Sequence, residues 1–512
     1  MRLPTCLLLM LGLAWTVGCV KMPSIESPVQ GFLKTVNNAI PLFRDIFNSV
    51  YENVNVTAFR SALKEAVSMV DAVFPSQPPK DVPERWWGEN DPKCEDTCIR
   101  PFTVQFSDEM ISDLRARIHG RRKLKRTLHG AANSFGTNSE YLGQFLEQWA
   151  DQYDFRARER WLNSFPQFIT NIQGLDIHYI HVKPHNPHNK KVLPILLLHG
   201  FPVTAFEYVH VINFLKKDRD DSDFVFEIVA PDLPGYAYSQ ATSKIGMAPY
   251  QMGIIMKNLM LRVGKSQFYI HCGNIGQDVG STMAVLFPGR VLGIHTNFPF
   301  SSRPQTITKL VLGQLYPPSV VEAKNEDKMY PLSAHLKDYM DNFGYFALQA
   351  SRPDNIGHGL DDSPVTLASW FLGNMAMGTE GPKSVFIDNG NLSAKYDMND
   401  WFDTFTVHWA CESMTTAARS YKESQARDKD SILKALELSQ SPVPYAAIKF
   451  RHEMVYMPDD FLRDKFPNLV HSTTLDFGGH FAGFEEPAVL ADSIWTSVAK
   501  MELYHENKTS TN

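Results

Sequence analysis

The segment "SQFYIHCGNIGQDVG", Ser266–Gly280, decides the fold of this 512-residue chain. Its apolar run "FYIHC" predicts a buried strand, and "IGQDVGSTMAVLF" predicts the helix that follows. Gly273 and Gly276 flank the turn at positions where a side chain would clash, so Asn274 is pushed outward at the helix N-terminus. The backbone N–H of Ile275 and the helix dipole can stabilise an anion there. The turn suits a nucleophile, but an amide is a poor one.

Strands and helices alternate around this turn. The stretches "GLDIHYIHV", "VLPILLLHG", "FVFEIVAPDLPG" and "VLGIHTNF" predict strands, and "YQMGIIMKNLMLRVG" predicts a helix. Continuous apolar strands joined by helices indicate a parallel sheet covered on both faces. A long helical stretch follows, before "VPYAAIKF" and "LVHSTTLDFGGH" resume the strands and "VLADSIWTSVAKMELY" closes with a helix. We therefore predict an α/β core in two parts, residues 191–300 and 439–512, with a helical lid at 301–438.

Three further motifs lie next to predicted strands. "LLLHGFPVTAFEY" places the backbone N–H of Phe201 where it could supply a second oxyanion contact. "DFGGHFAGFEEP" places His480 on a glycine-rich loop, where it could act as a general base. Glu453, in "FRHEMVYMP", follows the preceding strand and could orient His480. Nucleophile position, acid and histidine come in the chain order of the α/β-hydrolase fold, which we predict.

From about Trp86 to the C-terminus the chain resembles the microsomal epoxide hydrolase family, which includes the juvenile hormone epoxide hydrolases of insects. The motifs that carry the resemblance are "RWWG", "IRPF", "GLDIHYIHVKP", "HGFP", "PGYAYS", "FYIHCGNIG", "GYFALQ", "DDSPVTLASW", "RSYKES" and "GGHFAGFEEP". The resemblance implies an N-terminal meander, at residues 98–190, that wraps the core. It implies that His480 is the base, that Glu453 is its acidic partner, and that Tyr345 and Tyr421 hold the epoxide oxygen. It implies no cofactor and no metal.

The family's chemistry explains these residue types, and the chain departs from it at the first step. In the family a carboxylate attacks an epoxide carbon, tyrosines protonate the leaving oxygen, and water activated by histidine cleaves the ester. Here the family's Asp is Asn274, the Trp after it is Ile275, the Trp of "HGWP" is Phe201, and "PGYG" has Ala237. Removing a nucleophile lowers a rate by several orders of magnitude.

Three interpretations of Asn274 stay open. The protein is a non-catalytic member that keeps an apolar pocket for lipid epoxides; or His480 and water slowly hydrolyse the Asn274 amide to Asp; or one codon of the sequence is in error. The changes at Ile275, Phe201 and Ala237 favour the first, and the retained base, acid and tyrosines favour the others. We predict an epoxide hydrolase that adds water to apolar epoxides, xenobiotic or lipid, with a non-catalytic binding protein as the alternative.

The N-terminus predicts entry into the secretory pathway. Arg2, the apolar run "CLLLMLGLAWTV" and small residues near Cys19 are typical of a secretory signal, so residues 1–19 are expected to be a signal peptide or a membrane anchor. Residues 20–97 are expected to form an amphipathic helical extension, packed on the body or lying on a membrane, and a Pro-rich linker. Three glycosylation sequons, at Asn55, Asn391 and Asn507, fit a body in the endoplasmic reticulum or outside the cell.

The remaining signals narrow the class of partner. A net charge of −6 gives no reason to expect nucleic-acid binding. The histidines of "HYIHVKPHNPHNK" are expected at the surface rather than around a metal. Cys94 and Cys98 could form a local disulfide or stay free, and Cys272 and Cys411 are expected to be buried thiols.

Overall fold

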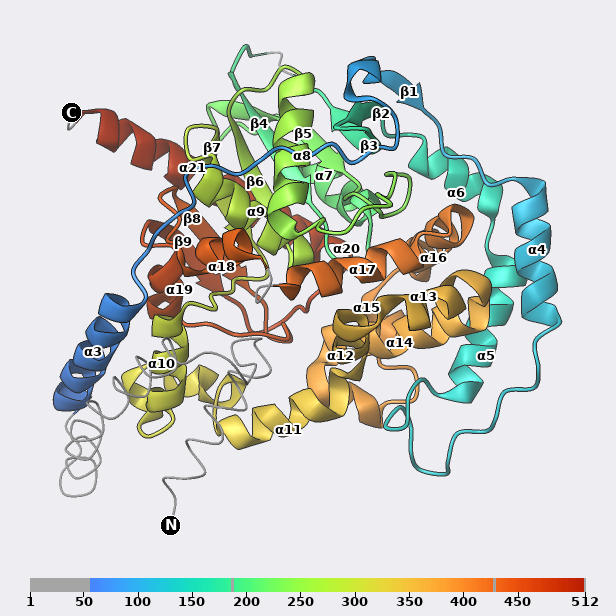
Figure 1. The fold of residues 1–512 in the computed structure, drawn as a ribbon. Helices are drawn as coiled ribbons and strands as arrows, with labels where there is room; N and C mark the ends of the chain where they lie inside the picture. The colour runs from blue at the N-terminus through green and yellow to red at the C-terminus, as the bar shows by residue number, and fades with distance from the viewer. Residues whose placement is uncertain (1–55, 186–187, 427–429, 511–512) are drawn as a thin grey trace.

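A nine-stranded mixed sheet forms the centre of the molecule (Figure 1). The computed structural model describes residues 56–185, 188–426 and 430–510. The strands, in sheet order, are β1 (Arg100–Phe102), β2 (Gln167–Ile172), β3 (Leu175–Val182), β5 (Phe224–Pro231), β4 (Lys191–Leu198), β6 (Phe268–Cys272), β7 (Val291–Thr296), β8 (Tyr445–Lys449) and β9 (Leu469–Thr474). From β5 to β9 all neighbours are parallel, and β1, β2 and β3 add antiparallel pairs. The predicted α/β-hydrolase architecture is confirmed.

Helices cover both faces of the sheet, as the alternation of apolar strands predicted. In Figure 1, α8 (Pro249–Arg262) and α9 (Asn274–Leu286) lie over one face. On the other face α21 (Pro487–Ser510) packs against α7 (Val209–Leu215). Strand β6 is buried along its whole length because it lies between two strands and two helical layers. This burial fixes the position of the turn that leads from β6 into α9.

The chain between β7 and β8 forms the helical lid. Its α-helices are α10 (Pro304–Gly313), α11 (Leu332–Asn342), α12 (Gly344–Ser351), α13 (Pro353–Asp362), α14 (Pro364–Glu380), α15 (Leu392–Lys395), α16 (Met398–Cys411), α17 (Met414–Ser424) and α18 (Ser431–Leu438). Helix α17 packs against both α12 and α13, so segments that are far apart in sequence lie side by side. Figure 1 shows most of these helices beside the end of the sheet at which α9 begins.

The N-terminal region runs along the sheet edge and the lid. It contains α4 (Asp108–His119), α5 (Ser139–Glu147), a π-helical turn (Gln148–Gln152) and α6 (Phe155–Leu162). Ser107 caps α4 by accepting a hydrogen bond from the N–H of Met110. Strands β1 and β2 were not predicted, because short antiparallel strands at a sheet edge need no continuous apolar run.

Helix α6 is joined to lid helix α16 by a buried ion pair. The guanidinium of Arg158 contacts the carboxylates of Asp400 and Asp403, whose side chains are only 6% and 5% exposed. The hydroxyl of Tyr153 donates to Asp403 at 2.6 Å. Burial raises the pKa of Asp403 to about 6, and Arg158 opposes that rise. The N-terminal region therefore holds the lid through charges that have little access to water.

Helix α3 (Val56–Val73) packs against the body of the protein. Phe59 and Leu63 are buried, and the ring of Phe59 lies 5.8 Å from that of Tyr316. Arg60 donates to the carbonyl of Ser319 at 3.1 Å. Of the two interpretations of the amphipathic extension, packing on the body is therefore correct for this helix. The part of the predicted extension before residue 56 and the segment expected to be a signal or anchor lie outside the described residues.

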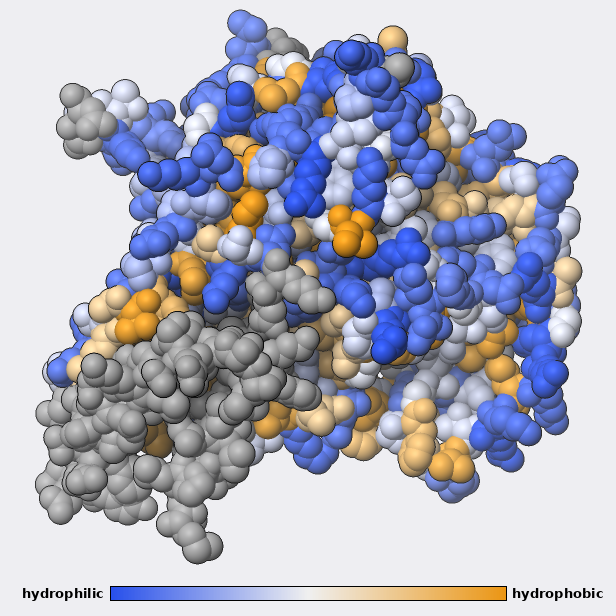
Figure 2. Space-filling view, viewed as in Figure 1, coloured by the Kyte–Doolittle hydropathy of each residue, from blue (hydrophilic) through white to orange (hydrophobic). Residues whose placement is uncertain are grey.

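None of the helices in the described ranges is both long and apolar enough to cross a bilayer. On the face seen in Figure 2, hydrophobic residues outside the grey atoms are scattered among hydrophilic ones. Isolated exposed hydrophobic residues of this kind are normal on a folded protein.

Candidate active site

Asn274 occupies a strained turn that only close-packed glycines allow. Its φ is +48°, a left-handed conformation that is costly for a residue with a side chain. A Cβ on Gly276 would lie 2.3 Å from the carbonyl oxygen of Leu198, and one on Gly200 would lie 2.3 Å from the Cβ of Asn274. The flanking loops therefore approach the turn as closely as backbone can, and they direct the Asn274 side chain into the space above the sheet.

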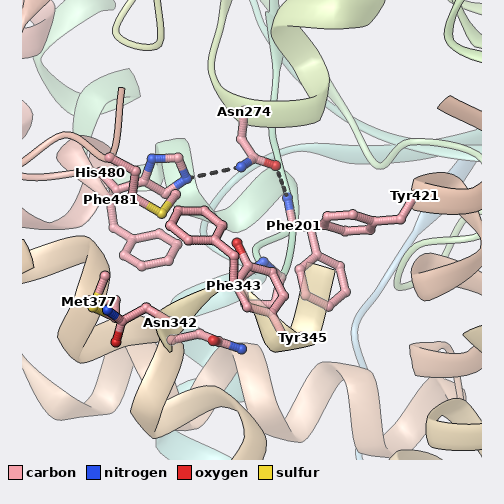
Figure 3. Close-up of a pocket in the computed structure, with 12 residues that line it drawn as sticks. Phe201, Asn274, Asn342, Phe343, Tyr345, Met377, Tyr421, His480 and Phe481 are labelled. Atoms are coloured by element: carbon pink, nitrogen blue, oxygen red, sulfur yellow. Dashed lines mark hydrogen bonds between the residues drawn. The ribbon is translucent and has the colours of Figure 1, made fainter. Parts of the chain in front are cut away.

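The orientation of the Asn274 amide follows from its neighbours (Figure 3). Its Oδ1 accepts hydrogen bonds from the backbone N–H groups of Phe201, at 3.1 Å, and Ile275, at 2.8 Å. Its Nδ2 lies 3.1 Å from Nε2 of His480. Because both backbone groups can only donate, the amide oxygen must face them and the NH2 group must face His480. The two predicted oxyanion donors therefore hold one oxygen of residue 274.

His480 is held in the tautomer that a general base requires. Its Nδ1–H donates to Oε1 of Glu453 at 2.7 Å, which leaves the lone pair of Nε2 toward Asn274. Both side chains are almost fully buried, with 4% and 2% exposed. Burial by itself would lower the pKa of His480, but the charge and hydrogen bond of Glu453 outweigh it, so the pKa is raised. The carboxylate stabilises the protonated imidazole that base catalysis produces.

Tyr345 on α12 and Tyr421 on α17 complete the cavity from the lid side. Their rings lie 6.2 Å apart and nearly perpendicular, and Figure 3 places His480 and Tyr421 on opposite sides of Asn274. Burial raises the pKa of both hydroxyls, so both keep their protons and can donate them. The cavity is mainly apolar and is lined by Phe201, Pro202, Asn274, Asn342, Phe343, Tyr345, Asn374, Met377, Tyr421, Met454, His480 and Phe481.

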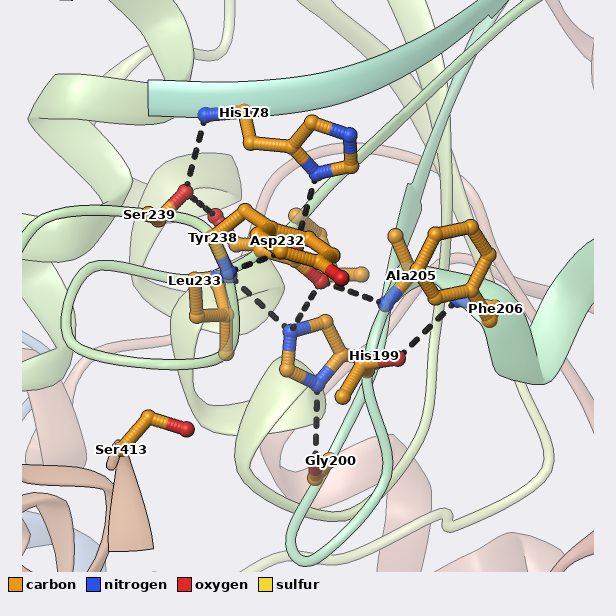
Figure 4. Close-up of polar contacts among 12 residues, drawn as sticks. His178, His199, Gly200, Ala205, Phe206, Asp232, Leu233, Tyr238, Ser239 and Ser413 are labelled. Atoms are coloured by element: carbon orange, nitrogen blue, oxygen red, sulfur yellow. Dashed lines mark hydrogen bonds and ion pairs between the residues drawn. The ribbon is translucent and has the colours of Figure 1, made fainter. Parts of the chain in front are cut away.

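A buried polar cluster, Asp232 with His178 and His199, supports the loop that carries Phe201 (Figure 4). The carboxylate of Asp232 accepts from Nδ1 of His178 at 2.7 Å and from the N–H of Ala205 at 2.8 Å. Nδ1–H of His199 donates to the carbonyl of Gly200 at 2.8 Å. Asp232, His178 and His199 are all fully buried. Their hydrogen bonds hold both ends of the "HGFP" loop.

Sequence reasoning missed this cluster and misplaced one of its members. His178 was predicted at the surface, but it faces inward from β3 and is buried between Asp232 and Gln167. His181 is partly buried and bonds Glu227, whereas His188 is exposed as predicted. The signal that could have found the cluster is Asp232 itself, a charged residue directly after a continuous apolar strand, which needs a buried partner.

A second missed residue, His408, connects the lid to the oxyanion loop. Its Nε2–H donates to the carbonyl of Pro202 at 2.6 Å, and its Nδ1 accepts from the hydroxyl of Ser413 at 2.7 Å. Burial lowers the pKa of His408 to about 4, so the ring is neutral at physiological pH. Ser413 begins the segment that leads into α17 and Tyr421. The side chain of His408 therefore holds both the segment that leads to Tyr421 and the loop that carries the Phe201 N–H.

The other predicted residues lie away from this cavity. Asn391 is partly buried and its Nδ2 donates to Glu380 at 2.6 Å, Asn507 is exposed on α21, and Asn55 lies outside the described residues. Cys98 is a free, exposed thiol, so the structure does not contain the local disulfide that was one of two alternatives for it. Cys272 is buried, as predicted, whereas Cys411 is only partly buried.

Comparison with known proteins identifies close relatives over most of the chain. The family model described as "Epoxide hydrolase N terminus" matches residues 99–208. A juvenile hormone epoxide hydrolase of Manduca sexta is 42% identical over 84% of this chain and 93% of its own length. "Epoxide hydrolase 1" of Oryctolagus cuniculus is 34% identical over 81% of this chain and 92% of its own. The crystal structure of juvenile hormone epoxide hydrolase from the silkworm Bombyx mori superimposes with a TM-score of 0.79 and 34% identity, covering 82% of this chain and 99% of that one.

Proposed function

We propose a function from the fact that this chain belongs to the epoxide hydrolase family of the juvenile hormone and microsomal enzymes. Its cavity binds apolar epoxides and hydrolyses them when residue 274 carries a carboxylate. The observation that supports this most directly is the continuous arrangement of two backbone N–H donors, residue 274, His480 and Glu453. These are the groups that a two-step hydrolysis through an ester needs.

The chemistry runs across the cavity from the tyrosines to the histidine. A carboxylate at position 274 attacks an epoxide carbon while Tyr345 and Tyr421 give hydrogen bonds and a proton to the departing oxygen. His480 then takes a proton from a water molecule, whose oxygen attacks the ester carbon. The N–H groups of Phe201 and Ile275 hold the negative oxygen that forms. As the ester C–O bond breaks, His480 returns its proton to the departing alkoxide, the diol leaves, and the proton of the carboxylic acid at position 274 restores the tyrosine hydroxyl.

With Asn at position 274 the same cavity binds an epoxide without opening it. The amide nitrogen shares its lone pair with the carbonyl, and the amide oxygen carries no full charge, so neither atom attacks carbon at a useful rate. The apolar lining and the two tyrosine hydroxyls do not depend on that residue. The second candidate function, a protein that only binds lipid epoxides, is supported by this retained lining.

The test is the substitution Asn274→Asp. We expect it to raise the rate of hydrolysis of apolar epoxides by at least about a thousand-fold, since it supplies the missing nucleophile. The reference is the starting protein, in which mass spectrometry confirms that residue 274 is still Asn. Asn342→Asp is the matched control, because it adds a carboxylate to the same cavity away from the turn. Its activity should stay at the level of the starting protein. An Asn274→Asp protein that is folded but inert on aromatic and fatty epoxides would favour the binding-only function.

We also propose the substrate class and the location of the protein. Several relatives are juvenile hormone epoxide hydrolases, and the lining here is mainly aromatic and aliphatic, so we propose lipid-like or aromatic epoxides as substrates. The apolar run at the N-terminus and the sequons support entry into the secretory pathway, with the body of the protein in the endoplasmic reticulum lumen or outside the cell. If the apolar run is not cleaved off, it associates the protein with the membrane through the N-terminus.

A further inference from the structure

We infer that this site hydrolyses its own Asn274 side chain to Asp, and so makes its own nucleophile. This goes beyond the proposed function and needs no epoxide. It rests on one comparison: an Asn amide has the same carbonyl as the ester intermediate of an epoxide hydrolase, with NH2 in place of the alkoxy group. A site built to hydrolyse that ester faces the amide in the same way.

The carbonyl of Asn274 is held as a reacting carbonyl would be. Its oxygen accepts two backbone hydrogen bonds, from Ile275 at 2.8 Å and Phe201 at 3.1 Å. Donors at these distances stabilise the negative charge that develops on oxygen when water adds to the carbon. Ile275 is also the second residue of α9, so the helix dipole favours the same charge.

The leaving nitrogen of Asn274 lies at the base. Nδ2 is 3.1 Å from Nε2 of His480, whose other nitrogen is bound to Glu453 at 2.7 Å. Both Asn274 and His480 line the cavity, so water can enter beside them, and it gives its proton to His480 once it takes over the Nε2 lone pair that Nδ2 holds in this structure. The raised pKa of His480 makes its protonated form a stable carrier between the two proton transfers.

The reaction balances without another reagent. Water oxygen bonds to the side-chain carbon as His480 takes one of its protons, and the carbonyl π electrons move to Oδ1. When the C=O bond forms again, the bond from carbon to Nδ2 breaks and His480 returns the proton to nitrogen. The products are ammonia, which takes up a proton in water, and the carboxylate of Asp at position 274.

Spontaneous deamidation follows another route, in which the next backbone nitrogen attacks the side-chain carbon and a mixture of Asp and isoaspartate results. At Asn274 that nitrogen belongs to a β-branched residue, and its N–H points to Oδ1 instead. The chain also contains Asn389 followed by Gly390, where no side chain hinders the cyclic route. The rate of deamidation at Asn389 therefore serves as an internal reference for spontaneous deamidation in the same chain.

The experiment compares the full-length protein with its His480→Gln variant, purified in parallel and incubated in water enriched in ¹⁸O. We expect the starting protein to be converted at residue 274, on purification or on incubation, with one ammonia released for each residue 274 that is converted. Peptides converted during incubation should gain about 3 Da, of which about 2 Da come from ¹⁸O, and should contain Asp without isoaspartate. In His480→Gln conversion at 274 should be at least about ten-fold slower, while Asn389 changes at the same rate in both.

Three results would overturn the inference: an amide at 274 that persists in the folded protein, conversion that is equally fast in His480→Gln, or an isoaspartate mixture at that position. Folding of the variant is checked by its thermal unfolding and by the unchanged rate at Asn389. Failure of the proposed function is a separate result, because Asn274→Asp measures epoxide hydrolysis whether or not the amide is ever hydrolysed.

Discussion

At the residue scale, the side chain of Asn274 makes three polar contacts, and all of them involve groups that serve hydrolysis. Oδ1 occupies the oxyanion position and Nδ2 takes the place where the base meets water or an ester oxygen. An amide fits because Asn and Asp have the same shape and differ in one atom. Asn in place of Asp at position 274 therefore removes the negative charge at the centre of the site and leaves the surrounding geometry in place.

Glu453 should control both the rate and the pH dependence of hydrolysis. In the Asn274→Asp background the rate should rise with pH as His480 loses its proton, since only the neutral ring accepts one from water. Glu453 raises the pKa of His480, so the midpoint should lie above the ordinary value of about 6.5. Glu453→Gln should move the midpoint to lower pH, because the imidazolium loses its partner, and should lower the rate by about 10²–10⁴-fold.

The measurement is the pH–rate profile of the Asn274→Asp protein with and without Glu453→Gln, and Glu486→Gln, directly after helix α20 (Ala482–Glu485), is the control. That control removes a carboxylate that makes no contact with the base, so neither the midpoint nor the rate should change. A Glu453→Gln profile with an unmoved midpoint would show that another group orients His480.

At the element scale, the site depends on segments that the chain brings together from far apart. The turn after β6 supplies residue 274, the loop after β4 supplies the Phe201 N–H, and α12 and α17 supply the tyrosines. The lid segments have no covalent link to the sheet other than their two ends. Their position therefore depends on contacts such as His408 to Pro202 and Arg158 to α16.

Arg158→Ala should lower the free energy of unfolding by about 3 kcal/mol, because it leaves Asp400 and Asp403 buried without their cation. Arg160→Ala on the same helix is the matched control. Arg160 is exposed on α6, so its loss should cost about 0.5 kcal/mol or less. Urea unfolding of the two variants measures the difference. Equal losses would mean that the buried ion pair does not hold the lid.

At the scale of the whole molecule, the fold could be predicted well from the sequence because its signals are local. The apolar strands β4, β5 and β6, the glycine-flanked turn and the Ser107 cap each leave a pattern in a few consecutive residues. The helical lid also followed from the pattern, and the family resemblance added the roles of its two tyrosines. The fold and family predictions are confirmed by the sheet and by the relatives.

Features that depend on distant partners could not be predicted in this way. His178 looks like a surface histidine in an alternating strand until Asp232, 54 residues later, is folded against it. The contact of His408 with Pro202 joins residues 206 positions apart. Strand β1 has three residues and includes a proline, so only its pairing with β2 makes it a strand. No local pattern encodes these pairings.

The proposed secretory location predicts glycosylation of the protein made in a eukaryotic host. Glycosidase treatment should lower its mass, and Asn507→Gln should remove part of that change because Asn507 is exposed. Asn391→Gln should have no effect, since the Nδ2 that would carry the glycan is partly buried and bonded to Glu380. An unchanged mass after treatment would count against a luminal or extracellular body.

The most direct test of the central claim, that residue 274 is the nucleophile position and His480 activates water, is to trap the ester. The double variant Asn274→Asp/His480→Gln is mixed with an excess of an apolar aromatic epoxide, and its intact mass and peptides are measured. We predict one epoxide bound covalently to each chain, mapped to residue 274, with little diol released, because attack proceeds and water is not activated. An unmodified chain, an adduct at another residue, or steady diol formation would contradict this assignment.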